Sequence, residues 1–296
     1  MNYVGCVKRT SPNYLWCVSR TLLTSDPRPL RTMRSIAIMN QKGGVGKTTT
    51  AVNLSAALAT LGLRVCLIDL DPQAHATLHF GIEPQPDELS IYHVLTGKTR
   101  LGEVLRPVSE NLWVVASSLD LAAAELELVG VIGRELILRD KLRDDPPPVD
   151  YLLIDCPPSL GILTLNALAA VGEVFIPLQP HFFALHGLSR LLETIDLVAS
   201  RINDKLRLGG VMLCMYDSGT RLAAEVGQDV DTFFLNARGQ ATPWADAQVF
   251  QTRIRRNVRL AEAPSFGQSI FQYAADSHGA EDYQRLAAEI VARSKG

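Results

Sequence analysis

The stretch MNQKGGVGKTTTAVN, residues 39–53, constrains the fold of this chain more than any other, because it places glycines and lysines between a strand-like run and a helix-like run. Residues 36–39 form a short apolar segment of buried-strand type, and apolar side chains recur at helical spacing after the glycines. The glycines therefore lie in a turn where backbone N–H groups converge on phosphate oxygens at the positive end of a helix dipole. We expect Lys47 to supply charge to a triphosphate and the hydroxyl of Thr48 to bind magnesium.

This loop departs from the commonest phosphate-loop pattern, because Gln41 stands where that pattern has glycine and a second lysine, Lys42, comes next. It resembles the deviant Walker A box, KGGxGK[ST], of the ParA and MinD superfamily of ATPases. The resemblance implies ATP and Mg²⁺ as ligands and a homodimer in the ATP state. It also implies catalytic roles for Lys47 and for Lys42, which would reach across the dimer interface to the partner's nucleotide. The nucleotide-binding residues implied by the resemblance are Lys42, Gly43, Gly44, Val45, Gly46, Lys47, Thr48 and Thr49.

Strand-like and helix-like segments alternate from residue 35 onward. The strands are nearly continuous apolar runs, which is typical of a parallel sheet covered by helices on both faces. The pattern predicts a doubly wound, mostly parallel α/β fold of the P-loop NTPase class, with ligands at the carboxyl ends of the strands. The predicted strands are residues 36–39, 65–70, 112–115, 151–155, 174–177 and 208–215, with 249–254 as a less certain seventh.

Residues 1–34 differ from the rest, because they carry six basic residues against one acid. A mobile basic arm that touches DNA and a transit peptide are two interpretations of this segment. We favour a disordered leader, or translation that begins at Met33 directly before the first strand. The remaining residues, 35–296, are predicted to form one domain, with the prolines at 146–148 as a surface link within it.

The net charge of -2 argues against a protein coated with basic residues, so any DNA contact must come from a local patch. The five cysteines form no CxxC pair, which disfavours disulfides, a zinc site and an iron–sulfur carrier of the same superfamily. We expect a reducing, cytoplasmic setting. No apolar run approaches the roughly 18 residues of a membrane span, and the six histidines show no HxxxH or HExxH spacing.

A second chemical site lies in VCLIDLDPQAHAT, residues 65–77, where Asp69 and Asp71 end a strand on the same side of it. Two carboxylates beside a triphosphate suggest metal and water handling. By resemblance to the first switch of the ParA family, Asp71 orients the attacking water and Asp69 supports it near the magnesium ion. The alternative is that these acids merely end a strand and begin a turn with Pro72. Ala74 and His75 stand where the family more often has Gly-Asn, so the loop is expected to move differently.

A third site lies in YLLIDCPPSLG, residues 151–161, where an apolar strand ends in the carboxylate of Asp155. This arrangement is that of a Walker B element, in which the acid binds magnesium through water. The DxPPS sequence also matches the second switch of the family. The predicted metal site therefore comprises Thr48, Asp69 and Asp155, with Cys156 as a small buried side chain.

The match to the family continues in RNVRLAEAPSFGQSI, residues 256–270, which is close to the signature of chromosome- and plasmid-partition ParA proteins. Members of this group bind DNA nonspecifically as ATP dimers, through basic residues here and after the preceding strand. The alternative is that some of these basic residues pair with Glu262, Asp246 or Asp231 at the surface. The segment 236–248 looks longer than its family counterpart. The arginines proposed to contact DNA phosphates are Arg221, Arg253, Arg255, Arg256 and Arg259.

These resemblances imply a nucleoid-associated ATPase that is slow without a partner. A ParB-like adaptor would stimulate it to segregate a chromosome or a plasmid. A MinD-like ATPase that positions another cargo is the alternative, but the last 18 residues lack the basic, bulky amphipathic helix that membrane docking needs. A nucleotide-gated scaffold without catalysis is disfavoured because both lysines and all three aspartates are present. His181 and His186 replace common family acids and are expected to tune the dimer or the adaptor contact.

Overall fold

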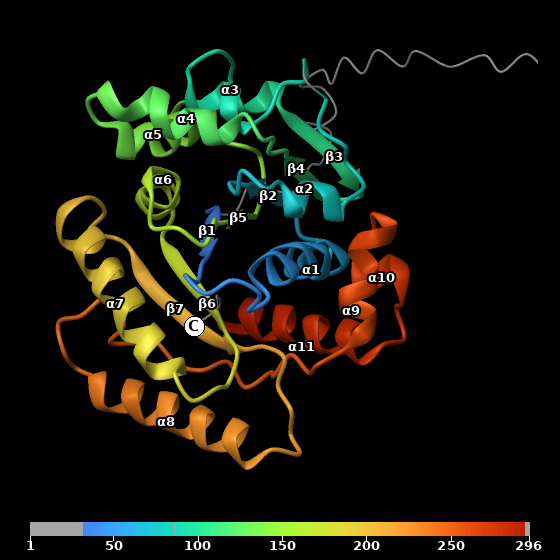
Figure 1. Ribbon diagram of the computed structural model, residues 1–296, viewed down its shortest axis with the longest axis vertical. Helices are drawn as coiled ribbons and strands as arrows, with labels where there is room; N and C mark the ends of the chain where they lie inside the picture. Colours follow the sequence, from blue (N-terminus) through green and yellow to red (C-terminus); the bar gives the residue numbers. More distant parts are fainter. Residues whose placement is uncertain (1–31, 86, 294–296) are drawn as a thin grey trace, which may run out of the picture.

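The computed structural model describes residues 32–85 and 87–293. They form a seven-stranded sheet in the order β3-β4-β2-β5-β1-β6-β7, and every neighbouring pair is parallel except β3 with β4. Helices cover both faces (Figure 1). The predicted doubly wound α/β fold is confirmed. The strands are β1 Arg34–Ile38, β2 Val65–Asp69, β3 Leu105–Ser109, β4 Leu112–Val115, β5 Tyr151–Asp155, β6 Glu173–Leu178 and β7 Arg207–Leu213.

Each face of the sheet has its own hydrophobic core. Successive residues of a strand point to opposite faces, so Ile36 and Ile38 join one core while Ala37 and Met39 join the other. The first core is closed by α1 and α11, and the second by α5, α6 and α7 (Figure 1). The helices are α1 Lys47–Thr60, α2 His75–His79, α3 Ile91–Leu95, α4 Leu121–Glu127, α5 Ile137–Asp144, α6 Ile162–Ala170, α7 Ala184–Arg201, α8 Arg221–Ala237, α9 Val258–Glu262, α10 Ile270–Tyr273 and α11 His278–Arg293.

One strand was not predicted and one predicted strand is absent. β3 is an antiparallel edge strand in which only Leu105 is buried, and half-buried and exposed residues alternate after it. It contains Arg106 and Pro107, so it lacks the continuous apolar run of the other strands. The prediction of a strand at 249–254 is wrong. That segment makes only an isolated bridge with β7, from Val249 to Val211. The ring of Phe250 occupies the space beside Gly210 where a side chain would stand.

The first strand is slightly longer at its start than the sequence predicts. β1 begins at Arg34, two residues before the predicted start of that strand, and Arg34 pairs with Glu173 of β6 at 2.5 Å. The basic leader was predicted over residues 1–34, and its residues 1–31 lie outside the described residues. The long segment after α8 covers the β7 edge, where the carbonyl of Pro243 accepts a hydrogen bond from the backbone N–H of Leu208. In the described part of the chain, no helix has the length and hydropathy to cross a bilayer.

Candidate nucleotide site

The predicted phosphate loop joins β1 to α1 at the carboxyl end of the sheet. Gly44 and Gly46 have φ angles of 72° and 90°, in the left-handed region that favours glycine, and α1 begins immediately at Lys47. The first turn of α1 contains no acid, so its positive end is uncompensated and suited to an anion. Thr48 and Thr49 are half-buried in that turn.

The two lysines of the loop occupy different environments. Lys47 is 8% exposed, and its Nζ donates to the carbonyl of Lys42 at 3.2 Å, so its side chain curls inside the loop. Burial lowers the pKa of Lys47, and the nearby carboxylates of Asp155 and Asp71 oppose that change. The side chain of Lys42 is exposed. The loop therefore uses Lys47 inside its own cradle and presents Lys42 outward.

Asn40 holds the beginning of the loop, and sequence reasoning did not identify it. Its Oδ1 accepts from the backbone N–H of Lys42 at 3.0 Å, and its Nδ2 donates to the carbonyl of Pro177 in β6 at 2.7 Å. Asn40 is buried, so this link is shielded from water. Its position between a strand and the glycine loop was the only sequence signal for it.

Asp155 lies in the parallel register opposite both Ile38 of β1 and Asp69 of β2. It is fully buried, and neither carboxylate oxygen has a hydrogen-bond partner among the described residues. Burial, followed by the charge of Asp69, raises the pKa of Asp155 well above its usual range. An unpartnered carboxylate beside the phosphate loop fits a magnesium ion, which prefers oxygen ligands and retains water.

The Asp69 carboxylate, by contrast, is fully engaged with protein donors. Its Oδ2 accepts from the backbone N–H and the hydroxyl of Thr77 at 2.8 and 2.7 Å, and its Oδ1 accepts from the backbone N–H of Asp71 at 3.2 Å. Burial raises the pKa of Asp69 from 3.8 to about 6 against these hydrogen bonds. Asp69 thus orders the loop between β2 and α2 while lying beside the predicted metal position.

Asp71 lies on that loop and is 7% exposed. Its Oδ1 accepts from the backbone N–H of Gln73 at 2.9 Å, and its carbonyl accepts from the hydroxyl of Ser117 at 2.7 Å. The backbone N–H of Ser117 also donates to the hydroxyl of Thr77 at 2.9 Å. Thr77 and Ser117, neither of which was predicted as a site residue, therefore fasten the loop to the end of β4.

Ala74, the residue that stands where the family more often has glycine, has a φ of 54°. A side chain in this left-handed region costs roughly 1 kcal/mol. The loop between Asp71 and α2 therefore stores strain that glycine would relieve. The expected difference in loop motion remains a prediction.

Four of the candidate DNA-contacting arginines lie in the segment 253–259, and the fifth, Arg221, begins α8. The backbone N–H of Arg256 donates to the carbonyl of Tyr216 at 3.3 Å, which joins the segment to the chain leading into α8. Arg221 pairs with Glu225 at 2.7 Å and Arg259 with Glu262 at 2.8 Å, both at the surface. Of the three acids considered as alternative partners, only Glu262 pairs with one of these arginines in the described part of the chain. The guanidinium of Arg253 donates to the Phe250 carbonyl.

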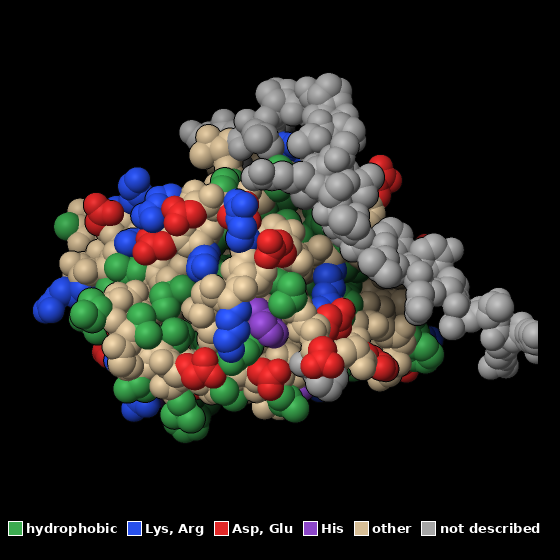
Figure 2. Space-filling model, turned by 90° about the horizontal axis from the view of Figure 1, so that it is seen from above, with side chains coloured by type: hydrophobic (Ala, Val, Ile, Leu, Met, Phe, Trp, Pro, Cys, Tyr) green, Lys and Arg blue, Asp and Glu red, His purple; other side chains and the backbone are tan. Residues whose placement is uncertain are grey.

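Charged side chains are interspersed on the face seen in Figure 2, where lysines and arginines alternate with acids instead of forming one basic field. This agrees with the net charge of -2. On this face, a contact with DNA phosphates would therefore involve a few basic residues and not a broad basic field.

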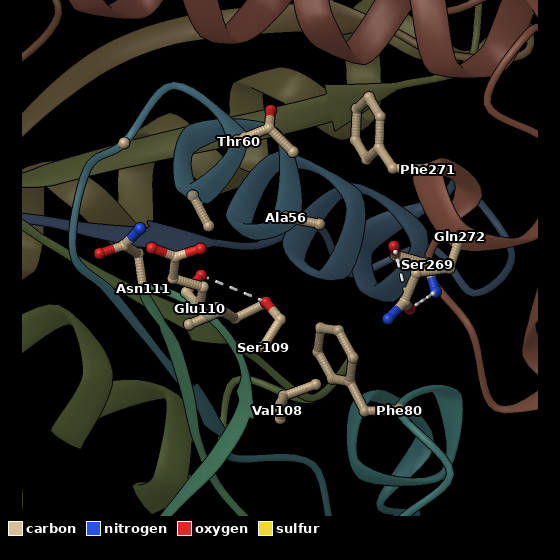
Figure 3. Close-up of a pocket in the computed structure, with 13 residues that line it drawn as sticks. Ala56, Thr60, Phe80, Val108, Ser109, Glu110, Asn111, Ser269, Phe271 and Gln272 are labelled. Carbon is tan, nitrogen blue, oxygen red and sulfur yellow. Dashed lines mark hydrogen bonds between the residues drawn. The ribbon is translucent and has the colours of Figure 1, made fainter.

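A separate cleft of about 500 Å³ lies against the carboxyl-terminal half of α1. Phe80 and Phe271 line it together with residues of the β3–β4 turn (Figure 3). It contains none of the predicted site residues. The phosphate loop and the three aspartates, not this cleft, form the candidate site.

Comparison with known proteins places this geometry in a family. Residues 33–208 match the family model described as an AAA domain. The chain is 47% identical over 262 residues to the chromosome-partitioning ATPase Soj of Treponema pallidum, covering 88% of this chain and 98% of that protein. It is 46% identical over 261 residues to the chromosome partitioning protein ParA of Myxococcus xanthus, covering 88% of each.

Solved structures agree with this placement. The crystal structure of cobyrinic acid a,c-diamide synthase from Mycobacterium smegmatis with a bound ATP analog and magnesium has a TM-score of 0.75 and 34% identity, covering 90% of this chain and 97% of that one. MinD from Pyrococcus horikoshii with Mg-ADP, at 22% identity and a TM-score of 0.67 over 88% of this chain and 96% of that one, shares the fold. The resemblance inferred from the motifs is confirmed, and the chain belongs to the Soj/ParA family of chromosome-partitioning ATPases.

Proposed function

We propose that the chain is an ATP-dependent dimeric switch that binds DNA nonspecifically and hydrolyses ATP to segregate chromosome or plasmid DNA with a ParB-like adaptor. The observation that carries the proposal is the contrast between the two loop lysines. Lys47 is buried within its own loop, whereas Lys42 is exposed and held at its backbone by Asn40. A lysine that its own cradle does not use is available to a nucleotide on a second subunit.

Exposed apolar side chains at the same edge of the sheet support a face-to-face dimer. Leu126 of α4 is 78% exposed, and Val129 and Ile132 after it are also exposed. Phe182 and Phe183, which follow β6, are 82% and 67% exposed. α4 and these phenylalanines both follow the carboxyl ends of parallel strands, the edge at which the phosphate loop lies. Closure of two such faces would bury this apolar surface beside the nucleotide.

Within the closed site, each side chain has a distinct task. Lys47 and the backbone N–H groups of residues 43–49 would bind the phosphates, and Asp155 with Thr48 would hold magnesium, which neutralises developing charge on the phosphate oxygens. Asp71 would orient the attacking water. Asp69 keeps the Asp71 loop in place through Thr77. Because the loop is fastened to β4 and no second subunit supplies Lys42, hydrolysis by the isolated chain is expected to be slow.

DNA would bind through phosphate contacts of Arg221, Arg253, Arg256 and Arg259, without reading bases. The closed dimer doubles this patch, so affinity depends on ATP, and hydrolysis stimulated by the adaptor releases the protein from the nucleoid. A membrane-docking role like that of MinD gains no support from α11. Its apolar residues Tyr283, Leu286 and Ile290 are buried in the core beside α1.

The test is DNA binding in ATP and in ADP over a series of salt concentrations. The proposal predicts tight, salt-sensitive binding with ATP and much weaker binding with ADP. Equal affinity in the two nucleotides would overturn the switch. A loss of salt dependence would overturn phosphate contact as the mode of binding.

A further inference from the structure

Two buried hydrogen bonds join the phosphate-loop helix to the carboxyl-terminal part of the chain. Thr50, in the first turn of α1, lies 3.1 Å through its hydroxyl from the hydroxyl of Tyr283 in α11, and both residues are buried. One turn later, Asn53 accepts from the backbone N–H of Ile270 at 2.8 Å and donates to the carbonyl of Thr49 at 2.8 Å. Figure 1 shows α1 lying beside both α11 and α10.

Arg255 is bound to the same turn of α11. Asp282, whose side chain is 4% exposed, accepts from the backbone N–H of Arg255 at 2.9 Å, from its Nε at 3.0 Å and from its Nη2 at 2.6 Å. Glu281 accepts from Nη2 as well, at 2.7 Å. These carboxylates raise the pKa of Arg255. A guanidinium with this many internal contacts is poorly placed to leave them for a DNA phosphate.

The next residue provides the contrast. Arg256 is exposed, and its guanidinium makes no hydrogen bond or ion pair with another residue in 32–85 or 87–293. The two adjacent arginines therefore differ in environment. Arg255 is bound to a buried carboxylate, and Arg256 faces solvent.

We propose that Arg255 is a positioning residue and not a DNA contact. Through Asp282, Arg255 fixes the arginine segment 253–259 to α11. Tyr283 of α11 in turn joins this helix to α1, the phosphate-loop helix. This inference rests on the proposed DNA-binding switch. The Thr50–Tyr283 bond is buried, so water cannot readily replace it, and Asp282 holds Arg255 through its backbone N–H as well as its guanidinium. A displacement of the first turn of α1 on nucleotide binding would therefore be passed to the segment that presents Arg256.

The test compares Arg255→Lys with Arg256→Lys, because lysine keeps the charge but loses the planar fork. DNA affinity is measured with ATP and with ADP at several salt concentrations. Arg255→Lys is expected to lower the ATP-over-ADP affinity ratio about tenfold, a usual size for coupling between sites, and to leave the salt dependence unchanged. Arg256→Lys is expected to stay near wild type. Arg256→Ala should weaken binding in both nucleotides and reduce the salt slope by about one.

Tyr283→Phe is the second variant, because it removes only the hydroxyl that meets Thr50. It is expected to lower the same ratio while the ADP-state affinity is retained. The positioning role is overturned if Arg255→Lys keeps the wild-type ratio. It is equally overturned if Arg255→Ala reduces the salt slope by about one, since that marks a lost phosphate contact.

Failure of the proposed function has a different signature. If the wild-type protein binds DNA equally in ATP and ADP, the proposed switch is wrong. The positioning role of Arg255 is then tested by measuring amide hydrogen exchange of residues 253–259 in the absence of DNA. Faster exchange in Arg255→Lys than in Arg256→Lys, together with a nucleotide-dependent change in wild type that Tyr283→Phe loses, supports the link. Identical exchange in all of these proteins contradicts it.

Discussion

Asp69 and Asp155 lie opposite each other in the parallel register of β2 and β5, yet within residues 32–85 and 87–293 only the Asp69 carboxylate has a hydrogen-bond partner. Neighbouring strands are about 4.8 Å apart, so two buried carboxylates at this register repel each other when both are ionised. The hydroxyl of Thr77 donates a hydrogen bond to one of them, the carboxylate of Asp69. The carboxylate of Asp155 is left for a cation.

Asp155→Asn removes the charge that fits magnesium and keeps the shape of the side chain. In wild type, saturating Mg-ADP is expected to raise the melting temperature more than ADP with a chelator does. That magnesium-dependent increment corresponds to ~3 kcal/mol at 100 times Kd. Asp155→Asn should abolish the increment, as measured by thermal unfolding. An undiminished increment in the variant would exclude Asp155 as a magnesium-binding residue.

Thr77→Val removes the hydroxyl that donates to Asp69 and accepts from Ser117. Leaving buried polar groups unpaired is expected to lower the free energy of unfolding by ~2 kcal/mol and to slow hydrolysis by loosening the Asp71 loop. Urea denaturation and single-turnover ATPase rates check both effects. Thr60→Val, at an exposed position of α1, is the matched control and should change stability by less than ~0.5 kcal/mol.

Substitution of the two loop lysines is expected to affect different steps, ATP binding for Lys47 and dimerisation or hydrolysis for Lys42. Lys47→Ala should abolish ATP binding, because Lys47 is the buried charge inside the loop. Lys42→Ala should keep ATP affinity within a few fold and lose dimerisation or hydrolysis instead. Titration with a fluorescent ATP analogue, followed by steady-state ATPase assays, distinguishes the two. Equal loss of ATP binding in both variants would count against a role for Lys42 across the interface.

His79 should make the protein less stable at low pH. Its side chain is 2% exposed, its Nε2 has no hydrogen-bond partner among the residues that the structure describes, and burial lowers its pKa from 6.5 to about 4. Because the folded pKa is lower than the unfolded one, the stability contribution is complete above pH 6.5 and falls as the pH drops toward 4. At ~1.4 kcal/mol per pKa unit the loss approaches ~3 kcal/mol.

The measurement is the free energy of unfolding of wild type and His79→Gln from pH 7.5 to 4.5. The difference between the two profiles isolates His79 from Asp69, whose raised pKa acts in the opposite direction over part of this range. Wild type should lose more stability than the variant as the pH falls. Parallel profiles would show that the pKa of His79 does not differ between the folded and unfolded states.

The sequence predicted the parts of this molecule that depend on neighbouring residues. The glycine turn at Gly44 and Gly46 and the aspartates that end β2 and β5 all follow from local pattern. β3 was not predicted, because its Arg106 and Pro107 interrupt the apolar run that is typical of the central strands.

Contacts between residues far apart in the chain were not predictable in this way. Ser117 meets the Asp71 loop from 46 residues away, and Asp282 meets Arg255 from 27 residues away. Neither contact has a sequence motif, because a buried carboxylate or hydroxyl is defined by the fold that surrounds it. From the sequence alone, Arg255 therefore cannot be distinguished from the other arginines of the segment, whereas the fold shows its contact with Asp282.

If ATP assembles two subunits through Lys42, the mass of the Asp71→Ala protein in solution shows it most directly. This variant is chosen because it should bind ATP without consuming it. Sedimentation in saturating Mg-ATP is predicted to give a species of twice the chain mass that returns to a monomer in Mg-ADP. A monomer in saturating Mg-ATP would contradict the account.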